Sequence, residues 1–459
     1  RSAIDQAFPV VVYAYKEEQL HRHAAYAAKA GYDVRVFAPG KPYSEIINPE
    51  DFLTDESDAN MAQQLAIVLN RNASSAYSSA SSSSADYFSK SADLLIQSLL
   101  MLAKSTIYPD LLMAWAILRL PNLAKRLQLA QQESWLDLWA EPGATSLSSV
   151  ADAPQTAGGI ASTANKTFAP LISREFVSSL CGQTTIPLNL EGKRILFFHL
   201  DQERRDAIAP LLASILHLTI VKNLASPRQD PLVLVMDELP TLYLPDLVKW
   251  INEYRENGLV TILGYQNHAQ LEHKYGKELT RSILGACATK VIFNPQDKVT
   301  AEEYEKYFGE EEIIIKSQSR SFGKNRGRSQ SEQHQKRPLI SARQLNTLPK
   351  GKCVFVNPAY GSEGEAALPQ ILSPKIPQLD LIAQKNSEQL WQQKVRTRLI
   401  ERAQRSQISL DAEALRSELQ NRFDVADSLF PVLPEEAGSG FDFTAFNEEK
   451  FAALSESEV

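Results

Sequence analysis

The sequence contains few cysteines, and their spacing suits neither disulfides nor zinc. Its 459 residues include three, Cys181, Cys287 and Cys353, which lie far apart and form no Cys-x-x-Cys pair. The seven histidines show no metal-ligand spacing. Disulfide frameworks and structural zinc sites need several such residues at short, regular intervals. The sequence therefore argues against both kinds of site, and the free cysteines fit a reducing compartment.

Long apolar runs are also absent. A membrane-spanning helix needs about twenty consecutive apolar residues, and the nearest candidate, Leu111–Leu118, is bounded by Asp110 and Arg119. We expect this run to be a core helix. The first residue is Arg rather than Met, which suggests a fragment or a processed product.

Neither sign of charge is in large excess. The 48 Lys and Arg residues and 55 Asp and Glu residues give a formal net charge of −7, so the overall field does not attract nucleic acid. Any contact with DNA must therefore be a local patch. Segment 316–343 is such a patch, because it carries eight basic residues and Glu332 as its only acid.

This basic segment is rich in Ser, Gln and Gly, and we expect a loop that buries no core. Its flexible basic side chains can neutralise phosphates in a salt-dependent, sequence-tolerant way. The alternative is a solvated polar loop that binds nothing. The candidate DNA contacts are Lys316, Arg320, Lys324, Arg326 and Arg328.

The clearest strand pattern ends in two acids. Leu232–Met236 is a continuous apolar run, as expected of a strand covered on both faces in a parallel sheet, and Asp237 and Glu238 follow it. Ligands bind at the carboxyl ends of strands in open α/β sheets, and an acidic pair there suits Mg²⁺ binding and activation of a water. The alternative is a solvated Asp-Glu turn.

The next elements bring a third polar residue to the same edge. Residues 245–254 have apolar side chains at helical spacing, and Arg255 and Gly258 end that helix. A second strand, Val260–Gly264, is also predicted to be buried, and it leads to Gln266. We therefore expect Gln266 beside the acidic pair.

The order of these residues resembles the type IV secretion coupling proteins, which are ring-forming conjugation ATPases. In that family the Walker B strand ends in Asp-Glu and a small residue, and a helix, Arg-x-x-Gly and a strand ending in Gln follow. The matching positions are Asp237, Glu238, Arg255, Gly258 and Gln266, with later matches at Gln270-Leu271 and Tyr275-Gly276. The small residue is not matched, because Leu239 follows Glu238.

The resemblance implies an α/β fold: a RecA-like P-loop NTPase sheet with an inserted all-α domain and a helical, acidic C-terminal tail. It implies ATP and Mg²⁺ as cofactors. Asp237 would hold Mg²⁺ through water, Glu238 would be the general base and Gln266 would sense the γ-phosphate. Arg255 would reach a neighbouring subunit's site as an arginine finger; the alternative for Arg255 is a helix-end residue that satisfies carbonyls.

The function implied by the resemblance is ATP-driven translocation of single-stranded DNA with its relaxase. A homo-hexameric ring on the cytoplasmic face of a bacterial inner membrane would carry it out, with relaxosome accessory proteins and type IV secretion channel components as partners. Two alternatives stay open. One is a degenerate, non-hydrolytic adaptor of the same fold that recruits the DNA-protein substrate, and the other is an unrelated α/β binding protein.

The phosphate-binding motif GxxxxGK[ST] is absent. Gly40-Lys41 is followed by Pro42, and Gly323-Lys324 has no strand before it. Because a P-loop supplies the N–H groups and the lysine that hold the phosphates, this chain alone should bind ATP poorly. We expect the loop upstream of Arg1, and a degenerate homologue is the alternative.

The patterns and the resemblance together predict four parts. They are the first part of the nucleotide-binding domain, the inserted all-α domain, the second part of the nucleotide-binding domain and the tail, over residues 1–56, 57–180, 181–375 and 376–459. In the first part we expect strands Pro9–Tyr15 and Tyr32–Phe37 around the helix Glu17–Ala30. The family carries Asp at the end of the first of these strands, where this sequence has Ala14.

The remaining predicted elements follow the same reasoning. In the all-α domain, which helps recognise the relaxosome in the family or else has no binding role, the predicted helices are Ala59–Leu69, Tyr87–Lys104, Leu118–Leu129 and Ser134–Trp139, with Ser74–Ser84 as a flexible connection. Further buried strands are predicted at Lys193–Leu200, Ala288–Phe293 and Cys353–Val356. Charged helices are predicted at Ser387–Arg405 and Ser409–Phe423, before a disordered or weakly helical tail, Asp424–Val459.

Overall fold

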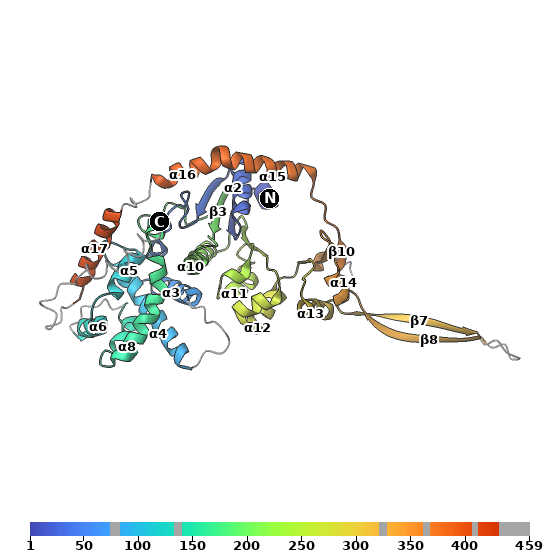
Figure 1. Ribbon diagram of the computed structural model, residues 1–459, viewed down its shortest axis with the longest axis horizontal. Coiled ribbons are helices and arrows are strands. Elements are labelled where there is room, and N and C mark those ends of the chain that lie inside the picture. Colours follow the sequence, from blue (N-terminus) through green and yellow to red (C-terminus); the bar gives the residue numbers. More distant parts are fainter. Residues whose placement is uncertain (74–82, 133–139, 321–327, 361–367, 406–411, 431–459) are drawn as a thin grey trace, which may run out of the picture.

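A five-stranded parallel sheet lies at the centre of the molecule (Figure 1). The computed structural model describes residues 1–73, 83–132, 140–320, 328–360, 368–405 and 412–430. The strand order is β2-β3-β1-β4-β5. The strands are β1 (Val10–Ala14), β2 (Asp33–Phe37), β3 (Arg194–His199), β4 (Leu232–Met236) and β5 (Leu259–Leu263). The strands predicted near Pro9–Tyr15, Tyr32–Phe37, Lys193–Leu200, Leu232–Met236 and Val260–Gly264 therefore form one sheet.

Helices cover the two faces of this sheet. On one face, α2 (Glu17–Lys29) packs over β1, β2 and β3 in a core that includes Val10 and Val12. On the other face, Val11 and Tyr13 join the core of the helical insertion and of α10 (Arg205–Asn223). Because successive residues of a strand point to opposite faces, the continuous apolar run of β1 fills both cores.

Seven helices described between β2 and β3 form the insertion. They are α3 (Ala59–Ala73), α4 (Ser83–Lys104), α5 (Leu111–Leu118), α6 (Leu123–Gln132), α7 (Glu141–Ser148), α8 (Pro154–Phe168) and α9 (Arg174–Leu180). Every residue of α5 is buried, so the core helix predicted there is confirmed. No helix in the described ranges is both long enough and apolar enough to span a bilayer.

Two predictions within the insertion need comment. The helix predicted at Leu118–Leu129 is wrong in its first turn, because α5 ends at Leu118 and α6 begins at Leu123, after Pro121. Proline lacks an N–H group and disfavours helical geometry in the residue before it. The predicted helix Ser134–Trp139 and nearly all of the predicted connection Ser74–Ser84 lie outside the described residues.

A second, smaller sheet stands apart from the first. Its strands are antiparallel in the order β10-β9-β6, and they are β6 (Lys290–Ile292), β9 (Cys353–Val356) and β10 (Gln370–Leu372). The strand predicted over Ala288–Phe293 is confirmed for Lys290–Ile292, but its predicted burial is wrong for Val291 and Phe293, which are each about half exposed. Apolar composition indicates a strand, but burial depends on a neighbour that covers it.

A long hairpin extends away from the body beside this sheet (Figure 1). Its strands, β7 (Glu310–Arg320) and β8 (Arg328–Pro338), pair in antiparallel register between α13 (Lys298–Phe308) and α14 (Ala342–Asn346). The prediction that segment 316–343 is a loop is therefore wrong for 316–320 and 328–338. Apart from Ile313–Ile315 both strands are polar, and each finds its backbone hydrogen-bond partners in the other strand.

The C-terminal helices pack on the body. Helix α15 (Gln378–Leu390), a π-helical turn (Trp391–Val395) and α16 (Arg396–Gln404) follow one another across α2 (Figure 1), and Trp391 is fully buried. Helix α17 (Ala412–Ser428) packs on α5. The prediction of a disordered or weakly helical segment from Asp424 is wrong for residues 424–428, and residues 431–459 lie outside the described part.

Candidate active site

The carboxyl ends of β4 and β5 bring two of the predicted site residues into contact. Glu238 follows β4, Gln266 follows β5, and Gln266 Nε2 donates a hydrogen bond to Glu238 Oε2 over 3.2 Å. Asp237 precedes Glu238 at the same edge. The two strands pair in parallel from Leu232 with Leu259 onward, so the edge is built from neighbouring strands.

Gly264 allows the two strands to stay close up to the acidic pair. A Cβ atom at this position would lie 2.5 Å from the carbonyl oxygen of Asp237, which is closer than a side chain tolerates. Its N–H group donates to the carbonyl of Met236, and its own carbonyl accepts from the N–H group of Leu239. The absence of a side chain therefore sets how near Gln266 comes to Glu238.

Asp237 has a partner that sequence reasoning missed. Gln19, in the first turn of α2, donates from Nε2 to Asp237 Oδ1 over 3.0 Å. Helix α2 follows β1, and β1 lies beside β4 in the sheet. No sequence motif predicts this contact, because it depends on β1 and β4 being neighbours in the sheet. The order of the strands along the chain does not show this.

Glu238 is half-buried, and its environment favours the protonated form. Burial raises the pKa of Glu238 above its usual value. The hydrogen bond from Gln266 opposes this pKa shift, the charge of Asp237 adds to it, and the charges of Lys16 and Arg205 oppose it. A carboxylate whose pKa is raised accepts a proton more readily than an exposed one, which suits a general base.

The backbone at Glu238 is also fixed. Thr241 Oγ1 donates to the carbonyl oxygen of Glu238 over 2.6 Å, and the same hydroxyl lies 2.6 Å from the hydroxyl of Tyr13. Tyr13 belongs to β1 and is fully buried. The side chains of Thr241 and Tyr13 tie the end of β4 to the neighbouring strand through the backbone of Glu238, and they do not use its carboxylate.

Arg255 lies at the other end of the sheet. It is exposed in the turn between α11 (Leu247–Asn252) and β5, so the length of β5 separates it from Gln266. The structure therefore does not bring Arg255 to Asp237 and Glu238 of its own chain.

The candidate DNA contacts lie on the hairpin. Lys324 and Arg326 fall outside the described residues. Lys316, Arg320 and Arg328 lie in its strands, where Arg320 is the register partner of Arg328 at the outermost described rung. Only the backbone of these three positions is described, and it places them far from the sheet edge (Figure 1).

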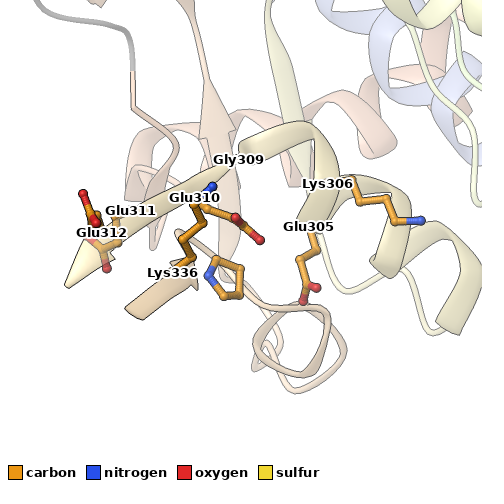
Figure 2. A pocket seen from close by; sticks show the side chains of 8 residues that line it. Glu305, Lys306, Gly309, Glu310, Glu311, Glu312 and Lys336 are labelled. Carbon is orange, nitrogen blue, oxygen red and sulfur yellow. The ribbon is translucent and has the colours of Figure 1, made fainter. Parts of the chain in front are cut away.

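The base of the hairpin borders a hollow of about 540 Å³. Figure 2 shows four glutamates there, Glu305, Glu310, Glu311 and Glu312, spread along the lining instead of converging on one point. Within the described ranges no three His, Cys, Asp or Glu side chains are grouped as metal ligands. The acidic side chains of this hollow are therefore not arranged as a metal site.

The side chains at the β4–β5 edge fit Mg²⁺ held through water. Mg²⁺ keeps several waters and needs only one or two carboxylates besides the substrate's phosphates. Asp237 supplies a carboxylate that a neutral amide orients, and Glu238 stands next to it. The edge offers a place for the metal, but no P-loop to hold the phosphates.

The sheet is open beside this edge. In the described part of the chain, β5 has a strand partner on one side only. Val260 and Ile262 are 44% and 53% exposed, and they share a sheet face with Val233 and Val235, their register partners on β4. The prediction of a buried strand over Val260–Gly264 is therefore wrong for these two side chains, because no helix covers this face of the edge strand in the described residues. That face is covered over β1 and β2 and uncovered over β5.

Comparison with known families gives a match over most of the chain. The family described as the type IV secretion-system coupling protein DNA-binding domain matches residues 69–361, well over half of the chain. The coupling protein TraD of Escherichia coli (strain K12) is 28% identical over 187 residues. That match covers 39% of this chain and 26% of TraD, so the chain matches about a quarter of that protein's length.

Solved structures of similar fold are those of the coupling protein TrwB. The unbound bacterial conjugative coupling protein TrwBdeltaN70 superposes with a TM-score of 0.55 at 14% identity, covering 82% of this chain and 80% of that one. The plasmid coupling protein TrwB in complex with ADP and Mg²⁺ gives a TM-score of 0.52 at 16% identity, covering 82% and 87%. The predicted fold, a RecA-like α/β sheet with an inserted helical domain, is confirmed.

Proposed function

Because this chain belongs to the type IV secretion-system coupling proteins, we propose that it is part of an ATP-driven DNA translocase that links the relaxosome to a secretion channel in conjugation. One observation carries the proposal. Glu238 and Gln266 meet at the carboxyl edge of two adjoining parallel strands, beside Asp237. A general base, a γ-phosphate sensor and a metal-holding carboxylate are needed together in ATP hydrolysis.

Each residue has a defined part in this proposal. Asp237 would hold Mg²⁺ through its water shell, and the bound metal would supply charge that stabilises the transferred phosphoryl group. Glu238, whose pKa is raised by burial, takes the proton of the attacking water. Gln266 contacts Glu238 and lies where it can report the state of the γ-phosphate to the end of β5.

The open side of β5 supports completion of the site by a further strand. Parallel sheets are normally covered on both faces, and an uncovered apolar edge strand pairs readily with another strand. A strand added beside β5 would end next to Gln266. We propose that this strand carries the phosphate-binding loop that the 459 residues lack.

The hairpin and the exposed arginine fit the translocation step. A two-stranded ribbon rich in Lys and Arg can follow a nucleic-acid backbone through phosphate contacts, and we assign single-stranded DNA with its relaxase as the substrate. In a hexameric ring on the cytoplasmic face of the inner membrane, Arg255 would act on the neighbouring subunit's nucleotide. Its place far from its own chain's Gln266 suits that role.

One observation favours a second candidate, a non-hydrolytic adaptor of the same fold. Ala14 stands at the end of β1, beside the acidic pair, where coupling proteins carry Asp. An adaptor would bind the DNA-protein substrate and hydrolyse no ATP. The two proposals differ in a single measurable property, ATP turnover by the unmodified protein.

The test compares ATP turnover by the intact protein, with and without single-stranded DNA, in wild type and in Glu238→Gln. We expect DNA-stimulated turnover in the wild type and a loss of about a hundredfold or more in the variant, because its amide cannot accept the proton. Glu256→Gln, in the exposed turn beside Arg255, is the control and should keep wild-type turnover. Turnover that survives in Glu238→Gln rejects the assigned role, and no turnover in the wild type selects the adaptor.

A further inference from the structure

Gln19 controls one oxygen of the Asp237 carboxylate. It donates to Oδ1 over 3.0 Å, and among the described residues no other side chain donates a hydrogen bond to this carboxylate. A neutral donor fixes the orientation of a carboxylate without cancelling its charge. Partners of this kind, one step removed from a metal, set how well the ligand binds.

The first turn of α2, which carries Gln19, is not held by its own cap. Lys16 occupies the N-cap position and provides no side-chain hydrogen bond to the helix. An uncapped helix start depends on tertiary contacts for its position. The position of Gln19 is therefore set by whatever packs against this turn.

Besides the sheet beneath α2, the C-terminal helical segment Gln378–Gln404 supplies contacts of this kind. The ring of Trp391 stacks on His21 with 4.3 Å between centroids, and it meets Tyr43 edge-on at 5.6 Å. Tyr43 donates its hydroxyl hydrogen to Glu17 Oε1 over 2.9 Å. Glu17 and His21 lie one turn apart on the same face of α2, so one tryptophan side chain contacts the face of the first turn opposite Gln19.

Trp391 is placed for this task by an unusual local geometry. It is fully buried and begins the π-helical turn Trp391–Val395 in an otherwise α-helical segment. Single π turns inside α-helices are frequently found at functional sites. The neighbouring ion pair, Arg22 Nε to Glu388 Oε1 at 2.7 Å, is partly exposed and contributes less.

We propose that Gln19 positions the Asp237 carboxylate and that the C-terminal helix, Gln378–Gln404, sets the position of Gln19 through Trp391. The segment of the chain after the second sheet thereby becomes part of the metal-binding apparatus. A partner that pulls on this helix would change the Mg²⁺ requirement of the site. This inference rests on the proposed function, since it concerns the metal that Asp237 holds.

The first arm of the test uses Gln19→Met in the intact protein. Methionine keeps the length and helix propensity of glutamine and removes the amide. We expect Mn²⁺ affinity, titrated by electron paramagnetic resonance with a non-hydrolysable ATP analogue, to fall about tenfold. The Mg²⁺ concentration for half-maximal turnover should rise equally, with turnover at saturating Mg²⁺ nearly unchanged. Mn²⁺ affinity equal to wild type overturns the proposal.

The second arm tests the coupling with Trp391→Leu, alone and combined with Gln19→Met. If Trp391 acts through Gln19, the double variant binds Mn²⁺ as Gln19→Met does, within about twofold. Additive losses overturn the coupling. Trp391→Phe keeps a stacking ring and should restore wild-type affinity, and Gln393→Ala, exposed on the same turn, is the control for the helix itself.

The two proposals fail in different ways. Loss of turnover in Glu238→Gln together with unchanged Mn²⁺ affinity in Gln19→Met rejects the positioning role and leaves the ATPase intact. Retained turnover in Glu238→Gln rejects the ATPase itself. If Trp391→Leu does not fold, the comparison of Trp391→Phe with Gln19→Met replaces it, since a ring that stacks must leave the metal requirement unchanged.

Discussion

At the β2 edge of the central sheet, side chains close over the strand, whereas the β5 edge carries bare apolar residues. Arg35 on β2 donates to Asp33 and to Glu45, and Arg402 of the C-terminal helix also binds Glu45, whose side chain is 1% exposed. At the opposite edge Val260 and Ile262 are about half exposed. In the described residues, side chains cover the β2 edge of the sheet, and the β5 edge stays uncovered.

This difference explains where the candidate site lies. The acidic pair and Gln266 stand at the carboxyl ends of β4 and β5, next to the unfinished edge. A site at the closed edge would be complete and inaccessible to further strands. The chain therefore leaves open the one side from which phosphate-binding groups can still be added.

The largest expected change in stability is at the covered part of the sheet, over β1 and β2. Trp391→Ala removes a fully buried side chain from the core over β1 and β2, and we expect a loss of about 3–5 kcal/mol in the free energy of unfolding. Urea unfolding measures it. Gln393 is exposed in the same π-helical turn, and Gln393→Ala should change this free energy by less than about 0.5 kcal/mol. Equal stability in the two variants would show that the C-terminal helix does not finish that side.

The next largest change in stability is expected at Gly264, where the ends of β4 and β5 approach closely. In Gly264→Ala the new Cβ meets the carbonyl oxygen of Asp237, and we expect about 1–3 kcal/mol of destabilisation from overpacking. Turnover should fall as well, since Gln266 moves away from Glu238. Gly285→Ala is the control, because its Cβ meets nothing within 4 Å inside α12 (His268–Ala286). A neutral Gly264→Ala contradicts the close approach.

A pH effect distinguishes a sealed carboxyl from an accessible one. Glu50 is fully buried with no hydrogen-bond partner for either carboxylate oxygen in the described residues, and burial raises its pKa well above the usual value. The folded state then keeps a proton that the unfolded state releases near pH 4, so stability falls as pH rises above about 4.3. Glu50→Gln removes this loss.

We therefore expect Glu50→Gln to raise the melting temperature at pH 7 and to match wild type near pH 4. The gain should grow with pH above about 4.3 by up to about 1.4 kcal/mol per pH unit until the carboxyl of the folded state ionises. Glu56→Gln, exposed nearby, is the control and should match wild type at both pH values. A gain that does not grow with pH contradicts the buried, protonated state of Glu50.

The smallest effect is expected on the open side. Val12, Val235 and Ile262 lie side by side on one sheet face, and Val12 is 8% exposed. Ile262→Ser should cost less than about 0.5 kcal/mol in this chain, as surface substitutions do, while Val12→Ser should cost several times more. Chemical unfolding compares the pair. Similar costs would mean that β5 is already covered.

The sequence predicted the sheet and its acidic edge because both depend on local pattern. Apolar runs such as Leu232–Met236 form buried strands wherever helices cover them, and the polar residues after β4 and β5 share an edge once the strands adjoin. The contact from Gln19 was not predictable, because it requires the order in which β1 and β4 adjoin. Trp391 was missed for a related reason. It lies in a segment whose pattern predicts only a charged helix, and its partners His21 and Tyr43 are far away in the sequence.

Other errors share one physical cause. The run Ala288–Phe293 has the composition of a buried strand, yet Val291 and Phe293 are half exposed. Whether a strand is buried depends on which other element packs against it, and the local sequence of the strand does not show that. The hairpin shows the converse, because its polar strands are held by pairing with each other and not by a core.

The most direct test of the account is a structure of the intact protein with Mg²⁺ and a non-hydrolysable ATP analogue. We predict that the waters of the metal contact Asp237, that the γ-phosphate lies between Glu238 and Gln266, and that a further parallel strand pairs with β5. A nucleotide bound at any other edge, or a β5 that stays unpaired beside a bound nucleotide, would contradict it.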